Sequence, residues 1–251
     1  AVRDRTGVTE EELQRFEEAA EAIYLPFDDG LGICAQDDAF LRRKRLDLAE
    51  IPRERFPLLL HHHPLFLYRH QVCKQADTVL AHFLFEEGEP EDVIRRTYDY
   101  YEPLTTHDSS LSECVFSMMA ARTGQPGKAL AYYGQSASLD LLNTHGNTGD
   151  GIHAANMGGC WMGIAFGFGG LRLREGGVLL RPCLPEGLKG YHFTVAWRGT
   201  MMRVRVDKQG VEIRRLHGPD MNIRVYEEER TLGDTLRVPL ETQPGSERQP
   251  C

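Results

Sequence analysis

Three short polar segments hold the residue types that bind a sugar or an anion. The first is Lys74-Gln75-Ala76-Asp77, which stands in an otherwise apolar stretch. On a helix, Lys74 and Asp77 would share one face and form an exposed ion pair. The apolar neighbours indicate burial instead, and they are Val72, Val79, Leu80 and Phe83. A buried ammonium group beside the Gln75 amide is able to bind sugar hydroxyls or an anion, so the spacing leaves both interpretations open.

The second segment, 105–112, reads TTHDSSLS and combines hydroxyl groups with a histidine and an aspartate. Asp108 or Ser109 is able to cap a helix that begins near residue 110. The adjacent hydroxyls of Ser109 and Ser110, beside His107, also form an anion site, because free amides and the helix dipole favour negative charge there. The two roles are compatible, and the sequence does not choose between them.

The third segment, 147–153, reads NTGDGIH. Its glycines let the backbone approach a ligand closely, and His153 is expected in the first turn of the next helix. A turn followed by a helix explains the same residues without a ligand. The run 61–63 is three histidines, but adjacent side chains point in different directions and no carboxylate or cysteine stands at ligand spacing. We therefore expect no metal site there.

A helical region, residues 1–170, is expected to position these segments. Thr9 and Glu12 form a capping-box pair that starts a first helix, and Pro26 stops it. A long irregular stretch follows over 26–64. Apolar residues at helical spacing then predict five more helices, over 65–86, 90–101, 109–123, 126–141 and 152–167. The six helices are expected to stack as antiparallel hairpins, with Lys74 inside the second.

The pattern changes to alternation in residues 171–240. Tyr191, Phe193, Val195 and Trp197 share one face of a strand, and further alternating runs follow at roughly ten-residue spacing up to Val238. This spacing predicts an antiparallel meander or sandwich rather than a parallel sheet. The polar residues 241–251 are expected to be a disordered tail.

Composition limits the class of protein. The chain has 251 residues, with 29 Lys and Arg against 37 Asp and Glu, for a net charge of −8. This balance argues against sequence-independent binding to nucleic acid, which needs many uncompensated cations. No apolar run reaches the roughly 18 residues that cross a membrane, so no membrane association is expected. Six cysteines without a CxxC pair indicate reduced thiols and a cytoplasmic location.

Taken in order, several motifs resemble glycoside hydrolase family 65. They are KQAD, YDYYEPLTTHDSSLS and NTGDGIHAANMGGCW, followed by a strand-rich end, and the likeness runs from about residue 16 to about 225. The chain is most similar to the inverting disaccharide phosphorylases of the maltose, trehalose, kojibiose and nigerose type. The resemblance implies the second half of an (α/α)6 barrel in residues 1–170, then a small β-sandwich-like C-terminal domain.

The resemblance also implies roles for single residues. Lys74 and Gln75 match positions that contact the glucosyl unit, and Ser109, Ser110, Gly151 and His153 match the phosphate-binding side. The substrates would be an α-linked glucose disaccharide and inorganic phosphate, with no cofactor and no metal. Inverting hydrolysis needs two carboxyl groups, whereas phosphate is already an anionic nucleophile, so one acid suffices.

The chain departs from the family at the catalytic acid. The family carries that Glu in a Gly-Pro-Asp-Glu-Tyr-type motif, and this sequence has no such motif. Residues 217–221 read HGPDM, which shares Gly-Pro-Asp but lacks the Glu. We therefore expect a C-terminal portion without a catalytic residue of its own. It would be inactive alone, need the N-terminal portion or a companion chain, and form a homodimer when complete. The alternatives are a family 65 hydrolase with Asp108 or Asp150 as base, and a non-catalytic sugar- or partner-binding fragment.

Overall fold

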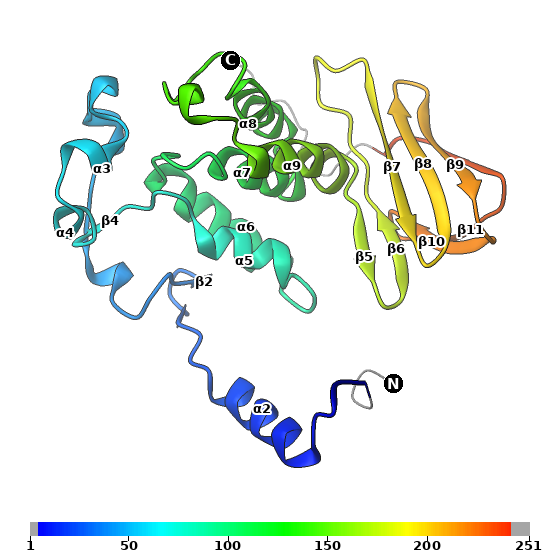
Figure 1. The fold of residues 1–251 in the computed structure, drawn as a ribbon, viewed down its shortest axis with the longest axis horizontal. Coiled ribbons are helices and arrows are strands. Elements are labelled where there is room, and N and C mark those ends of the chain that lie inside the picture. The colour runs from blue at the N-terminus through cyan, green and yellow to red at the C-terminus, as the bar shows by residue number, and fades with distance from the viewer. Residues whose placement is uncertain (1–4, 242–251) are drawn as a thin grey trace.

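The computed structural model describes residues 5–241, and Figure 1 shows how the elements follow one another in space. Short elements lie at one end, a group of helices in the middle and two sheets at the other end, with the first helix set apart below. The helices are α2 Glu10–Ala22, α5 Asp77–Leu84, α6 Glu91–Tyr101, α7 Ser112–Arg122, α8 Pro126–Ser138 and α9 Ala154–Met162, which continues as a π-helical stretch, Gly163–Phe168.

Helix α2 begins as its sequence predicts. The Thr9 side chain accepts the Glu12 N–H at 3.2 Å, and Glu12 Oε2 accepts the Thr9 N–H at 2.9 Å, which completes the capping box. The helix buries none of its residues, and Phe16 on its apolar face is 62% exposed. Among the described residues, this face therefore has no packing partner.

The long stretch before α5 is built from short elements. They are β1 Phe27–Asp28, β2 Ile33–Cys34, β3 Lys44–Arg45, α3 Leu58–His61, α4 Pro64–Leu67 and β4 His70–Gln71, with three 3₁₀ turns at 40–42, 48–50 and 53–55. Two pairs of these strands are hydrogen-bonded, β1 with β2 and β3 with β4. The segment is thus ordered, although it holds no long helix or strand.

The prediction of one helix over 65–86 is wrong. Helix α4 ends at Leu67, β4 follows, and α5 does not begin until Asp77. The chain stays extended between them because Cys73 donates its N–H to the Leu104 carbonyl and accepts the Thr106 N–H, both at 2.8 Å. These two bonds use backbone groups that a continuous helix would need.

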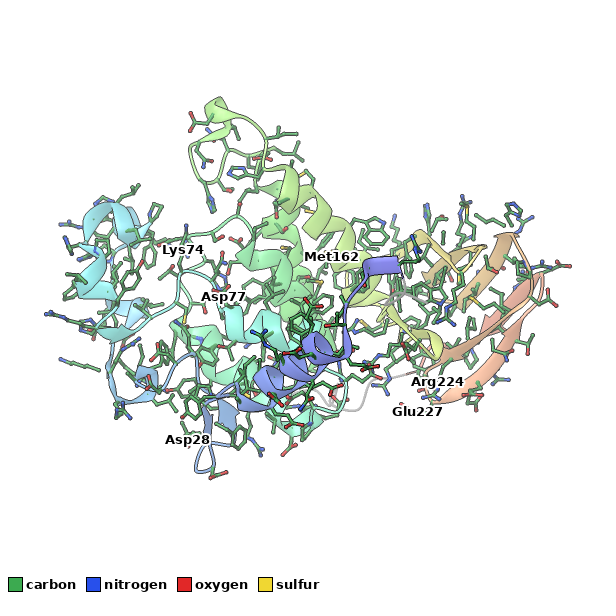
Figure 2. All side chains as sticks on the ribbon, turned by 60° about the horizontal axis from the view of Figure 1, so that its bottom comes forward. Asp28, Lys74, Asp77, Met162, Arg224 and Glu227 are labelled. Atoms are coloured by element: carbon green, nitrogen blue, oxygen red, sulfur yellow. The ribbon has the colours of Figure 1, made fainter. Side chains whose placement is uncertain are left out.

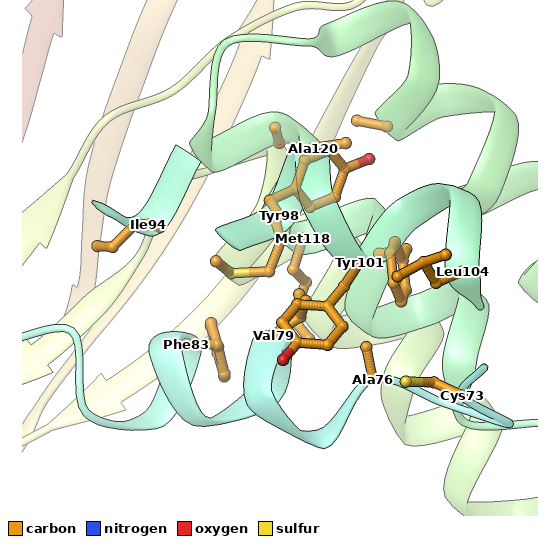
Figure 3. Packing of buried hydrophobic residues seen from close by; sticks show 14 of the residues in the cluster. Cys73, Ala76, Val79, Phe83, Ile94, Tyr98, Tyr101, Leu104, Met118 and Ala120 are labelled. Carbon is orange, nitrogen blue, oxygen red and sulfur yellow. The ribbon is translucent and has the colours of Figure 1, made fainter. Parts of the chain in front are cut away.

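The core of the helical region lies between α5, α6 and α7 (Figure 3). Val79 of α5, Tyr98 and Tyr101 of α6 and Met119 of α7 are fully buried there. Helix α8 packs on α7 along its length, and α9 packs on both. The paired arrangement expected from the sequence is thus present for α5 with α6 and for α7 with α8. It is wrong for the first predicted helix, since α2 buries none of its residues and lies apart from the other helices (Figure 1).

The C-terminal region consists of two four-stranded sheets. One has the order β11-β10-β6-β5 and the other the order β12-β9-β8-β7. Their strands are β5 Arg172–Arg174, β6 Gly177–Leu180, β7 Gly190–Trp197, β8 Thr200–Asp207, β9 Gly210–His217, β10 Met221–Val225, β11 Glu228–Leu232 and β12 Thr235–Val238. Both sheets contribute side chains to one core, such as Val178 and Leu180 from the first and Val204 and Ile213 from the second.

All but one of the pairings within these two sheets are antiparallel. Strand β10 runs parallel to β6, with Ile223 beside Val178. The expected antiparallel region is therefore confirmed except at this one pairing. The reason is the excursion between them, since residues 181–220 pass through the other sheet before the chain returns to the first. Of the tail expected to be disordered, 242–251 lies outside the described residues.

Candidate functional site

Two of the three polar segments lie side by side. Cys73 forms a parallel bridge with Thr105, so the loop that carries Lys74 and Gln75 runs along the start of the Thr105–Ser112 segment. Lys74 is exposed and precedes α5, so the expectation that it is buried within a helix is wrong, and Gln75 is half-buried. Gln75 donates from Nε2 to Asp77 Oδ1 at 3.0 Å, and Asp77 is the first residue of α5. Figure 2 shows Lys74 and Asp77 on the side of the molecule away from Arg224 and Glu227 of the sheets.

Asp108 does not cap α7, the helix that follows its own segment. Its Oδ2 accepts the backbone N–H of Leu58 at 2.8 Å, which ties this loop to α3. Helix α7 begins only at Ser112, and no side chain caps it. Ser109 accepts the Leu111 N–H at 3.4 Å within its own turn. Within residues 5–241 the Ser110 hydroxyl has no hydrogen-bond partner, so it is available to a ligand.

His107 has a structural position. Its ring packs edge-on against Phe116, with centroids 4.7 Å apart, and its Nδ1 lies 2.8 Å from the Ser112 hydroxyl. Burial lowers the pKa of His107 to about 4, against a smaller opposing effect of Glu102. Because a neutral ring among aromatic side chains binds an anion poorly, His107 is not a candidate anion ligand. The candidates in the Thr105–Ser112 segment are its hydroxyl groups.

His153 stands at the N-cap of α9, one residue before the first turn in which it was expected. Its Nδ1 is 2.6 Å from Asp140 Oδ1, and its backbone N–H donates to Asp140 Oδ2 at 2.9 Å. The ring and backbone hydrogen bonds from His153 hold the pKa of Asp140 below its usual value. Gly151, two residues earlier, has φ of 123°, a backbone conformation that favours glycine. A Cβ at this position would meet no atom within 4 Å, so the backbone there is open to a ligand.

The charges around Asp108 connect the three segments. Burial raises the pKa of Asp108, while the Leu58 N–H, Thr106, His145 and Lys74 act in the opposite direction. The charges of Lys74 and His145, from two different loops, therefore both act on this carboxylate. The His145 ring in turn lies edge-on to His153, with centroids 6.4 Å apart. We call Lys74, Gln75, Asp108, Ser109, Ser110, His145 and His153 the Asp108 site.

Sequence reasoning missed Asp140 and His145, which precede His153 by thirteen and eight residues in the LDLLNTHGN stretch. It singled out the segment that begins with Asn147 but gave Asn147 no role, although its Nδ2 lies 3.3 Å from His153 Nε2. The sequence did offer a signal for them, because a carboxylate, a histidine and an amide stand close together just before a glycine-rich turn. Their contacts depend on how the loop between α8 and α9 folds back on itself.

A separate cavity of about 580 Å³ lies where the helical region meets the first sheet. Glu86, Arg122, Arg172, Arg174 and Arg181 are among its lining residues, and no member of the Asp108 site is. Its cations pair with its own carboxylates, as Arg172 and Arg174 do with Glu86. We therefore place the candidate chemistry at the Asp108 site.

The structure also bears on the expectations for metal binding, cysteine pairing and membrane association. Within residues 5–241, no group of three or more His, Cys, Asp and Glu side chains is arranged to hold a metal ion. The His63 ring instead accepts the Leu65 N–H at 3.2 Å at the start of α4. Cys34, Cys73, Cys114, Cys160 and Cys183 are free thiols. No helix in this range is long and apolar enough to span a membrane.

Comparison with known proteins gives two family matches and several relatives. Residues 1–162 match the glycosyl hydrolase family 65 central catalytic domain, and residues 171–232 match the family 65 C-terminal domain. An α,α-trehalose phosphorylase of Geobacillus stearothermophilus is 50% identical over 96% of this chain and 31% of its own length. A kojibiose phosphorylase of Caldanaerobacter subterraneus subsp. tengcongensis is 32% identical over 92% of this chain and 30% of its own.

A solved structure from the human microbiome, assigned as a kojibiose phosphorylase, has the same fold. It superimposes with a TM-score of 0.85 and 30% identity, over 94% of this chain and 32% of that one. The chain thus spans about a third of the length of the curated relatives that it matches.

Proposed function

Because this chain belongs to glycosyl hydrolase family 65, we propose that it forms the phosphate-binding side and the C-terminal region of an α-glucoside phosphorylase. The whole enzyme would cleave an α-glucosidic bond of a disaccharide with inorganic phosphate. The anomeric configuration would be inverted, giving β-glucose 1-phosphate and a free sugar. No cofactor or metal takes part in this proposal.

The observation that carries the proposal is that the two kinds of residue belong to one neighbourhood. The Lys74 loop, which resembles the glucosyl-binding positions, runs along the Thr105–Ser112 segment, and the charges of Lys74 and His145 both act on the Asp108 carboxylate. The His145 ring lies next to His153, which resembles a phosphate-binding position. The free Ser110 hydroxyl, the Gly151 turn and the His153 imidazole are the kinds of group that bind phosphate.

The bond changes in the proposed reaction balance without a further reactant. A phosphate oxygen attacks the anomeric carbon as the bond to the glycosidic oxygen breaks, and that oxygen takes a proton from a carboxylic acid. The resemblance places the acid in a motif that this sequence does not contain. We therefore propose that residues 1–251 by themselves catalyse no turnover, and that the half-barrel is completed by other residues of the enzyme.

A phosphate-dependence assay on the full-length protein tests the function. Because the trehalose phosphorylase shares more identity with this chain than the kojibiose phosphorylase does, α,α-trehalose is the first substrate to try. We expect glucose and β-glucose 1-phosphate to form in equal amounts, and only with phosphate present. Proton NMR of the fresh product identifies the anomer.

The same assay separates the alternatives. Equal glucose release with and without phosphate contradicts phosphorolysis and supports a hydrolase. In that case Asp108→Asn would abolish the release, since Asp108 would be the base that activates water. No turnover of any α-glucoside by the full-length protein would contradict both enzymatic functions and leave a binding role, for which the exposed apolar face of α2 is the first surface to test.

A further inference from the structure

Asp140 holds His153 at two points. One carboxylate oxygen lies 2.6 Å from the ring Nδ1, and the other accepts the backbone N–H at 2.9 Å. Asp140 stands two residues after the last residue of α8, and His153 directly precedes α9. The contact closes the loop between these helices and fixes the ring and its backbone together.

This contact decides which ring nitrogen is available to a ligand. A carboxylate only accepts hydrogen bonds, so Nδ1 must carry the hydrogen. In the neutral ring, Nε2 therefore accepts a hydrogen bond from Asn147 Nδ2 at 3.3 Å, and it is the ring nitrogen that Asp140 does not hold. The His153 side chain keeps 21% of its surface exposed, so a small solute is able to reach it.

Asn147 and His153 together suit an anionic oxygen. In the protonated ring Nε2 also carries a hydrogen, and it then faces the hydrogens of Asn147 Nδ2 across 3.3 Å. Two donors at this distance need a common acceptor, and an oxygen of an anion supplies one. Within residues 5–241, the buried Asn147 Oδ1 has no partner, so nothing in this range ties the amide to another group on that side.

We propose that Asp140 is a positioning residue for phosphate binding, which orients His153 so that Nε2, with Asn147 Nδ2 beside it, receives a phosphate oxygen. The proposal rests on the proposed function, since phosphate is the anion that the reaction would bring to this loop. Asp140 and Asn147 lie between α8 and α9, whereas Lys74 and Gln75, the proposed glucosyl-binding residues, precede α5. We therefore expect substitutions of Asp140 and Asn147 to act on phosphate and not on the disaccharide.

The test uses the full-length protein and measures the KM for phosphate and the KM for the disaccharide separately. Asp140→Asn keeps the size of the side chain but removes its charge and one of its two acceptor oxygens. We expect the KM for phosphate to rise about ten- to a hundredfold, the factor for losing one hydrogen bond to a charged group. The KM for the disaccharide should stay within about twofold.

A second variant keeps the test valid if Asp140→Asn folds poorly. Asn147→Asp replaces the neutral donor with a carboxylate of equal size, which repels phosphate at Nε2. It should raise the KM for phosphate by at least as much. The matched control is Glu89→Gln, which removes the carboxylate 3.9 Å from Nδ1 of another histidine, His82, and should alter neither constant.

Three results would overturn the role of Asp140. They are an unchanged KM for phosphate in a folded Asp140→Asn protein, an equal rise of both KM values, and an unchanged KM for phosphate in Asn147→Asp. These results are distinct from failure of the proposed function. That failure appears in the wild-type protein, as glucose release that does not depend on phosphate.

Discussion

The Glu86 carboxylate and the Arg172 guanidinium form a buried ion pair that joins the helical region to the first sheet, with Glu86 Oε1 2.5 Å from Arg172 Nε. Glu86 follows α5, and Arg172 begins β5. Arg122 of α7 and Arg174 of β5 contact the same carboxylate. One acidic side chain therefore holds cations from both parts of the fold.

Removing this carboxylate should destabilise the protein strongly. Glu86→Gln leaves Arg172, only 10% exposed, without its counter-charge, and breaking a buried ion pair on one side costs about 3–5 kcal/mol. We expect a large fall in the denaturation midpoint of the full-length protein. Glu87→Gln is the control, because Glu87 is 79% exposed and lies 3.8 Å from Arg174. Equal effects of the two substitutions would refute the importance of the buried pair.

The same group should give the protein a pH-dependent stability. Burial alone would raise the pKa of Glu86, but the hydrogen bonds and charges of Arg172 and Arg122 outweigh it and hold the pKa below the ordinary 4.5. A lowered pKa in the folded state means that the stabilisation is complete above pH 4.5 and is lost as the pH falls through the folded value. Thermal denaturation between pH 7 and pH 3 should show this loss, and Glu86→Gln should reduce it.

Alanine substitutions at two adjacent glycines of α9 should change the stability of the protein in opposite directions. A Cβ on Gly159 would lie 2.5 Å from Cys114 Sγ of α7, whereas one on Gly158 would meet nothing within 4 Å. Gly159→Ala should therefore destabilise the protein by about 1–3 kcal/mol through overpacking. Gly158→Ala should stabilise it by about 0.5–1 kcal/mol, because alanine is the better helix former. Chemical denaturation of both variants checks the pair, and a shared sign would contradict this packing.

His153→Ala should impair phosphate binding selectively. It removes Nε2 but leaves the residues of the Lys74 loop unchanged, so the KM for phosphate should rise about tenfold or more while that for the disaccharide changes little. Steady-state kinetics with each substrate varied in turn provides the measurement. His192→Ala, on the exposed side of β7, is the control. A larger effect on the disaccharide would refute the phosphate role of His153.

Lys74→Ala should produce the converse result. Loss of a hydrogen bond from a charged group to a sugar hydroxyl lowers kcat/KM for the disaccharide by about ten- to a hundredfold. The exposed Lys208, in the turn between β8 and β9, provides the control substitution to alanine. If kinetics were unaltered in Lys74→Ala, the residue would be a surface cation without a role in the site.

Several features were readable from the residues because their causes are local. The capping box of Thr9 and Glu12 spans four residues, and the alternation around Phe193 and Val195 sets which face of β7 is buried. Both act within one turn or one strand, so the order of residue types is sufficient to predict them. The order of several such segments along the chain was also sufficient to identify the family.

Other features depend on hydrogen-bond partners far away in the sequence, and only the tertiary structure showed them. Cys73 stays extended because its hydrogen bonds go to Leu104 and Thr106, so the apolar periodicity over 65–86 did not yield one helix. Asp108 accepts the N–H of Leu58, fifty residues earlier, instead of capping α7. Periodicity records which side of an element is apolar, but it carries no information on which distant backbone group satisfies a given donor. The position of the Lys74 loop along the Thr105–Ser112 segment follows from such bonds, and only the folded chain supplies them.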